Sequence, residues 1–181
     1  EILLIGYGAI GQYVYKHIAQ VSHSRVAHVL CRQGRQMEVR RSLGERVSCV
    51  IDCAAIVDSV DLVVECAGHS AVHRYLPALL ASGKNVISVS SGALADADLE
   101  QQLRQSASSG SSQIKLLSGA IGSLDALSAA SVGGLESVVY RGRKPPVGWK
   151  GSAAEQRLDL DSLSAPEIFF AGSAREAALT F

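Results

Sequence analysis

The chain begins with a short apolar segment that leads directly into a glycine-rich turn. Ile2–Ile5 is apolar, and Gly6, Gly8 and Gly11 then form the pattern G-x-G-x-x-G. An amphipathic helix is expected from Ala9 to about Gln20, so the glycines fall between a strand and a helix. There the first glycine permits a tight turn, the second lets the backbone approach a pyrophosphate, and the third lets helix pack on strand. This order predicts a dinucleotide site at the helix N-terminus, with candidate cofactor-binding residues Gly6, Gly8, Ala9, Ile10 and Gly11.

Strand and helix patterns alternate along the next hundred residues. We expect strands at 25–30, 47–50, 61–66, 85–89 and 113–117, and helices at 70–81 and 96–106, the second capped by Asp96. This alternation is typical of an α/β fold, a Rossmann-type doubly wound parallel sheet that binds its ligand over the carboxyl ends of the strands. Cys66, Ala67 and Gly68 follow one expected strand, and residues 88–92 follow another, so both are candidates for the cofactor wall.

The end of the second expected strand bears on the choice of cofactor. Folds of this kind that prefer NAD carry an Asp or Glu about 20 residues beyond the glycines, which binds the adenosine ribose. Here the strand ends without an acid, in a segment that carries Arg32 and Arg35. Two guanidinium groups can grip a 2′-phosphate or stack on adenine, which favours NADP or tolerance of both cofactors. The alternative is that both arginines are solvated loop charges.

Composition argues against several other classes of function. Lys+Arg and Asp+Glu both number 17, so no basic field gathers nucleic acid or anionic lipid. No apolar run is long enough to cross a bilayer, and the first residues lack the basic segment of a signal peptide, so a cytoplasmic protein without nucleic-acid or membrane partners is expected. The four cysteines lack C-x-x-C spacing and are expected to be reduced core thiols. His69 and His73 lack a third ligand, and no metal site is expected.

The polar run at 107–112 is expected to be a surface loop, and the strand at 113–117 then closes a dinucleotide-binding domain over residues 1–117. A second glycine-rich turn follows at 118–127, with a helix to about residue 131. A strand at 137–140 comes next, and a helix begins near Ser173.

Four segments, in order along the chain, resemble the L-aspartate dehydrogenase family: 65–69, 116–127, 140–145 and 170–175. The resemblance implies an NAD(P)-dependent oxidoreductase that oxidatively deaminates L-aspartate to iminoaspartate, which hydrolyses to oxaloacetate and ammonia. It implies a role in NAD biosynthesis and a homodimer. It also implies that Ala120 contacts the cofactor, and that residues 118–181 begin an α+β domain for substrate binding and dimerisation that is incomplete at its C-terminus.

The resemblance leaves the catalytic residues unassigned. Members of the family continue through an Asn-containing segment and a catalytic histidine, and neither is present here. Arg141, Arg143 and Lys144 are candidates for binding the substrate carboxylates, with a basic surface loop as the alternative. His69 either borders the nicotinamide or is an exposed residue at a helix start. Two other functions stay open: a related reductase resembling homoserine dehydrogenase or dihydrodipicolinate reductase, and a dinucleotide-binding redox sensor without catalysis.

Overall fold

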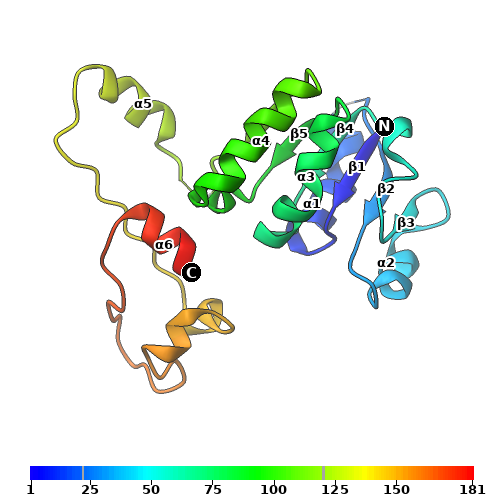
Figure 1. Cartoon of the computed structure of the whole chain (residues 1–181). Coiled ribbons are helices and arrows are strands. Elements are labelled where there is room, and N and C mark those ends of the chain that lie inside the picture. The colour runs from blue at the N-terminus through cyan, green and yellow to red at the C-terminus, as the bar shows by residue number, and fades with distance from the viewer. Residues whose placement is uncertain (22, 120) are drawn as a thin grey trace. The chain divides into compact units, whose positions relative to one another are not determined.

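The computed structural model describes residues 1–21, 23–119 and 121–181. The chain divides into two compact units, Glu1–Ala120 and Ile121–Phe181. In Figure 1 the first unit runs from blue to green and the second from yellow-green to red.

The first unit is built on one six-stranded parallel sheet. Its strands are β1 (Ile2–Ile5), β2 (Val26–Leu30), β3 (Ser48–Val50), β4 (Leu62–Glu65), β5 (Asn85–Ser88) and β6 (Ile114–Leu116). The order across the sheet is β3-β2-β1-β4-β5-β6, and each adjacent pair is parallel. This order confirms the expected doubly wound fold. The chain reverses its direction of winding between β1 and β4, so a ligand is expected above the carboxyl ends of these two strands.

Helices cover both faces of this sheet because successive residues of each central strand point to opposite sides. Ile2 and Leu4 pack in one core with residues of α1 (Ala9–Val21) and α2 (Gln36–Leu43). Leu3 and Ile5 pack in a second core with residues of α3 (His69–Ala81) and α4 (Ala97–Ser109). Figure 1 shows α3 and α4 lying side by side. Two 3₁₀ helices, Val57–Ser59 and Ser91–Ala95, complete the first unit among the described residues.

The structure differs from the sequence-based expectation at α2 and at the end of α4. Helix α2 was not expected, because Val39 and Leu43 are its only buried residues and its other positions are mostly polar. Helix α4 continues to Ser109, so the expectation of a loop beginning at 107 is wrong. The helix ends at Gly110, whose backbone lies so close to α3 that an added Cβ would be 1.9 Å from the Leu80 carbonyl oxygen. The close approach of α3 therefore requires glycine at position 110, where α4 ends.

The second unit contains α5 (Leu124–Val132), α6 (Ala174–Thr180) and the 3₁₀ helices Pro146–Trp149 and Ala153–Gln156. The helix expected near Ser173 is confirmed: Ser173 and Glu176 form a reciprocal capping box at the start of α6. Phe169 and Phe170 precede this helix, and Phe181 follows it. The ring centroid of Phe181 lies 5.3 Å from that of Phe169 and 5.3 Å from that of Phe170.

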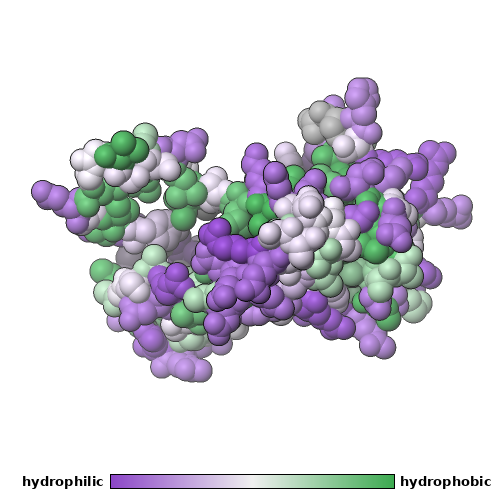
Figure 2. Space-filling model, turned by 45° about the horizontal axis from the view of Figure 1, so that its top comes forward, coloured by the Kyte–Doolittle hydropathy of each residue, from purple (hydrophilic) through white to green (hydrophobic). Residues whose placement is uncertain are grey.

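The expectation of a strand at 137–140, directly before the basic residues Arg141, Arg143 and Lys144, is wrong. These residues are irregular and exposed, with Val139 at 75% exposure. A strand needs a partner for its backbone groups, and residues 121–181 form no other strand. Several apolar side chains of the second unit face solvent, including Val132 and Ile168. Figure 2 shows such hydrophobic residues in green at the surface, among hydrophilic ones in purple.

Candidate functional site

Two of the three glycines in the first turn are required by the backbone itself. Gly6 follows β1 with φ +93°, and a Cβ there would lie 2.8 Å from the Cβ of Ala67. Its N–H donates to the Leu30 carbonyl at 2.9 Å, which ties the turn to β2. A Cβ on Gly11 would lie 2.2 Å from the Gly6 carbonyl oxygen. These positions must be glycine for α1 to start against the end of β1.

Gly8 is different, because a Cβ placed on it would meet no atom within 4 Å. Ala9 and Ile10 follow it as the first residues of α1, and both are exposed. No acidic residue occupies the first turn of this helix, so its partial positive charge is not compensated there. A free space beside Gly8, next to an exposed helix N-terminus, is the arrangement that a pyrophosphate requires. The residues of this turn therefore fit a dinucleotide.

A second turn, which joins β4 to α3, lies against the first. Cys66 donates its N–H to the Ile5 carbonyl at 2.8 Å, and Ala67 packs against Gly6. Gly68, with φ +106°, precedes α3, which begins at His69. The structure thus brings together two segments at the carboxyl ends of β1 and β4, with the contacting residues Ile5 and Cys66 lying 61 positions apart in sequence. His69 is exposed at this edge, and its contact with a nicotinamide stays a prediction.

Glu65, the last residue of β4, is a residue of this site to which the sequence reasoning gave no role. It is fully buried, and its carboxylate accepts hydrogen bonds from two backbone N–H groups and two serine hydroxyls: Ala67, Gly68, Ser88 and Ser90. The sequence feature that could have identified Glu65 is an acidic residue at the end of an otherwise apolar strand, since a buried carboxylate needs hydrogen-bond donors around it.

The two arginines beyond β2 are in different situations. Arg35 is paired with Glu38, through a contact of 2.6 Å from Nη2 to Oε1 and one of 3.0 Å from Nε to Oε2. This guanidinium holds the pKa of the Glu38 carboxyl below its usual value. Arg32 is exposed in the loop after β2. Because the charge of Arg35 is already balanced, Arg32 is the better candidate for a 2′-phosphate.

The cysteines belong to the core beneath this region. Cys31, Cys49 and Cys53 are buried and Cys66 is partly buried, all as free thiols. The Sγ atoms of Cys31 and Cys49 lie 3.2 Å apart. Burial, helped by the Cys49 thiol, raises the pKa of Cys31 to about 12. Burial likewise raises the pKa of Cys66 to about 11. Cys31 and Cys66 are therefore neutral packing groups at ordinary pH and not nucleophiles.

The substrate-binding candidates of the second unit lie on an irregular, exposed segment instead of following a strand. Arg141 and Arg143 are exposed. Lys144 is exposed too, and its ammonium lies 4.3 Å from the centroid of the Trp149 ring. Their role in substrate binding stays a prediction. Ala120, expected to contact the cofactor, lies outside the described residues.

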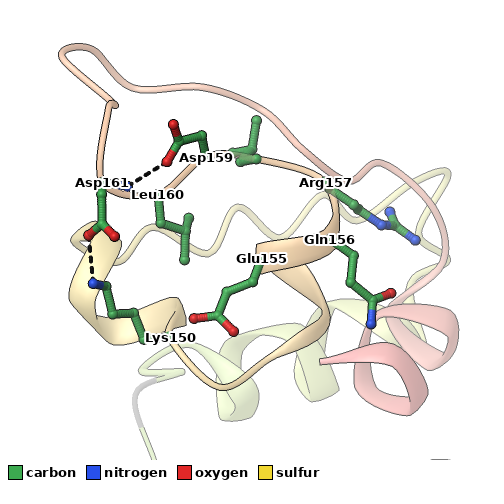
Figure 3. A pocket seen from close by; sticks show the side chains of 8 residues that line it. Lys150, Glu155, Gln156, Arg157, Asp159, Leu160 and Asp161 are labelled. Atoms are coloured by element: carbon green, nitrogen blue, oxygen red, sulfur yellow. Dashed lines mark hydrogen bonds and ion pairs between the residues drawn. The ribbon is translucent and has the colours of Figure 1, made fainter.

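Two surface hollows lie away from the glycine-rich turn. One, of about 540 Å³, is lined by Lys150 and residues 155–161. Figure 3 shows two interactions among its lining residues: Lys150 contacts Asp161 at 2.5 Å, and the Asp161 N–H donates to Asp159. The other, of about 800 Å³, lies between α2 and the β2–β3 edge of the sheet. Neither hollow includes the turns at the ends of β1 and β4, so neither marks the candidate dinucleotide site.

Within residues 1–21, 23–119 and 121–181, no three His, Cys, Asp or Glu side chains come together as a metal site would need. Nor is any helix there both long and apolar enough to cross a membrane.

Comparison with family models divides the chain near the boundary between the two units. Residues 6–116 match the model described as the NAD binding domain of homoserine dehydrogenase. Residues 125–181 match the model described as the C-terminal part of aspartate dehydrogenase. The first unit is therefore a nicotinamide-dinucleotide-binding domain.

Comparison with individual proteins extends over the whole chain. The chain is 42% identical, over its full length, to an L-aspartate dehydrogenase of Ruegeria pomeroyi, of which it covers 64%. It is 44% identical over 98% of its length to one from a Polaromonas species, of which it covers 67%. A solved structure of aspartate dehydrogenase from Thermotoga maritima matches 71% of the chain and 49% of its own length, at 26% identity and a TM-score of 0.56. The chain spans about two thirds of the length of the curated relatives it matches.

Proposed function

The chain belongs to the L-aspartate dehydrogenase family, and on that premise we propose that its protein oxidises L-aspartate with NAD or NADP. The product is iminoaspartate, which water converts to oxaloacetate and ammonia. The observation that carries this proposal is the order of the two family matches, a dinucleotide-binding domain followed by residues similar to the C-terminal part of aspartate dehydrogenase.

The first unit supplies the part of this function that depends on the cofactor. Helix α1 begins directly after Gly8, beside which a pyrophosphate has room to bind near the free N–H groups of the first turn. The turn at Cys66–Gly68 borders the crevice between β1 and β4, where the nicotinamide half is expected. When bound, the nicotinamide ring accepts a hydride from the substrate. The protein must hold that ring rigidly beside the substrate Cα, since misalignment of the reacting atoms costs rate steeply.

Binding of L-aspartate requires partners for two carboxylates. Guanidinium and ammonium groups serve this purpose because they make short, charge-assisted hydrogen bonds. In the second unit Arg141, Arg143 and Lys144 provide such groups on one exposed segment. We assign them to substrate binding, and we assign no catalytic acid or base within this chain.

Cofactor choice follows from the segment after β2. Arg32 is exposed at the end of β2, where an acidic side chain would select the ribose of NAD. Arg35 is engaged by Glu38. We therefore propose that the protein accepts NADP through Arg32 and also tolerates NAD.

The partners, cellular location and oligomeric state of the protein are proposed from its composition and its family. The balanced charge suits neither a nucleic acid nor an anionic membrane. The buried free thiols suit a reducing compartment, which supports a cytoplasmic location. A homodimer and a role in NAD biosynthesis are proposed from the family alone.

The deciding experiment follows NAD(P)H formation by the protein that contains this chain, with L-aspartate as substrate and with L-homoserine and L-glutamate as comparisons. L-homoserine is the important competitor, because the first unit matches a domain described for homoserine dehydrogenase. Preference for L-aspartate is the expected result. Preference for L-homoserine, or cofactor binding with no turnover of any of the three, would refute the proposal.

A further inference from the structure

The buried carboxylate of Glu65 connects two turns at the cofactor edge of the sheet. One oxygen, Oε1, accepts the backbone N–H groups of Ala67 and Gly68 at 2.6 and 2.8 Å. These groups belong to the turn between β4 and α3. The same oxygen accepts the hydroxyl of Ser90 at 3.0 Å, and Oε2 accepts that of Ser88 at 2.5 Å. The two serines come from the end of β5 and the turn that follows it.

The carboxylate and the two serines are closed to solvent. Glu65 and Ser88 are fully buried, and Ser90 is 9% exposed. The Ser90 N–H also donates to Ser88 Oγ at 3.1 Å, so the serines hold each other as well as the carboxylate. Burial of a carboxylate is costly unless several donors compensate for the lost water, and four donors converge on this one. The surroundings of Glu65 are therefore suited to a buried carboxylate.

The turn that Glu65 holds is the turn on which the glycine-rich loop rests. Ala67 receives one of the Glu65 hydrogen bonds, and its Cβ would be 2.8 Å from any Cβ placed on Gly6. Movement of Ala67 therefore shifts the support of the loop that approaches the pyrophosphate. Gly68, which receives the second bond, precedes α3.

We propose that Glu65 is a positioning residue for the dinucleotide, holding the β4–α3 and β5 turns in the shape that the cofactor requires. This inference rests on the proposed use of NAD(P) at this edge of the sheet. Because Glu65 is fully buried, we assign it no direct contact with the cofactor. Its effect passes through Ala67 to the loop at Gly6.

The test measures the affinity of this chain for NADH and NADPH by fluorescence titration, together with its melting temperature. The variant Glu65→Gln keeps one acceptor oxygen and loses the charge and the second acceptor. We expect its Kd to rise about tenfold, the effect of one lost charge-assisted hydrogen bond. The matched control is Ser112→Ala, which removes a hydroxyl of similar burial that donates to the Leu80 carbonyl at 2.8 Å. Ser112 precedes β6, at the opposite ends of the strands, so this variant should lose stability and keep its affinity.

A second readout is amide hydrogen exchange of Ala67 and Gly68, which should become faster in Glu65→Gln and stay unchanged in Ser112→Ala. If Glu65→Gln does not fold, Ser88→Ala replaces it, with an expected rise in Kd of about threefold from one lost hydrogen bond. Unchanged affinity in the folded variant, or an equal loss in Ser112→Ala at equal loss of melting temperature, would overturn the inference. A wild-type chain that bound neither cofactor would instead refute the proposed function, and the inference with it.

Discussion

Replacement of Gly8 or Gly11 by alanine adds the same methyl group at two points of one turn, with opposite expected consequences. At Gly11 the new Cβ would lie 2.2 Å from the Gly6 carbonyl oxygen. That oxygen cannot yield easily, because Gly6 is hydrogen-bonded to β2 through its N–H and packed against Ala67. Overpacking of this kind costs about 1–3 kcal/mol. Alanine gains about 0.5–1 kcal/mol over glycine in a helix, which offsets only part of the cost.

We therefore expect Gly11→Ala to lose up to about 2.5 kcal/mol of unfolding free energy, which corresponds to a fall in melting temperature of up to about 10 °C for a domain of this size. At Gly8 the methyl group meets nothing within 4 Å, and the backbone is not in the left-handed region. Gly8→Ala should keep or slightly raise the melting temperature, since it reduces the freedom of the unfolded chain. It should weaken cofactor binding at least about tenfold, because the methyl group occupies the space that the pyrophosphate needs.

Thermal unfolding and NAD(P)H fluorescence titration of the two variants and the wild type measure both effects. The reasoning predicts a crossed result, in which Gly11→Ala loses mainly stability and Gly8→Ala loses mainly affinity. Wild-type affinity in Gly8→Ala would mean that the pyrophosphate binds elsewhere. A stable Gly11→Ala would mean that the close approach of α1 to β1 is not a constraint of the fold.

Three further predictions concern the first unit. Arg32→Glu should weaken NADPH binding about tenfold and weaken NADH binding less. Arg35→Ala should leave the ratio of the two affinities unchanged, because Glu38 already neutralises Arg35. Titration of both variants with both cofactors measures this, and an equal loss of NADPH affinity in the two variants would count against Arg32. Because the pKa of Cys31 is raised to about 12 when folded, its contribution to stability is complete below its ordinary value of 9.0 and is lost as the pH rises toward 12. Urea unfolding across that range should therefore show a smaller loss in Cys31→Ala, and an unchanged slope would contradict the assignment. Asp96→Ala removes the side chain that caps α4 and should cost about 1 kcal/mol of unfolding free energy, whereas Asp98→Ala, which removes no cap, should cost less.

Features that depend on neighbouring residues were predictable from the sequence. The strand, glycine turn and helix at the start of the chain follow from short apolar runs and from the backbone freedom of glycine, and the structure reproduces them within a residue or two. The N-caps at Asp96 and Ser173 were predictable because a cap is a contact between residues two or three apart. The parallel order of the sheet followed from the alternation of these local elements.

Features that depend on packing between distant residues required the tertiary structure. The serine-rich run continues α4 to Ser109, and only the structure shows that Gly110 lies against α3. The expected strand at 137–140 does not form, and residues 121–181 offer no partner strand. The residues around Glu65 are up to 25 positions away in sequence. The sequence by itself determined where a dinucleotide is expected to bind, because the glycine pattern is a local demand on the backbone. Only the tertiary structure decided what supports that site, because the hydrogen-bond donors to the buried Glu65 carboxylate come from neighbouring strand ends that are distant in sequence.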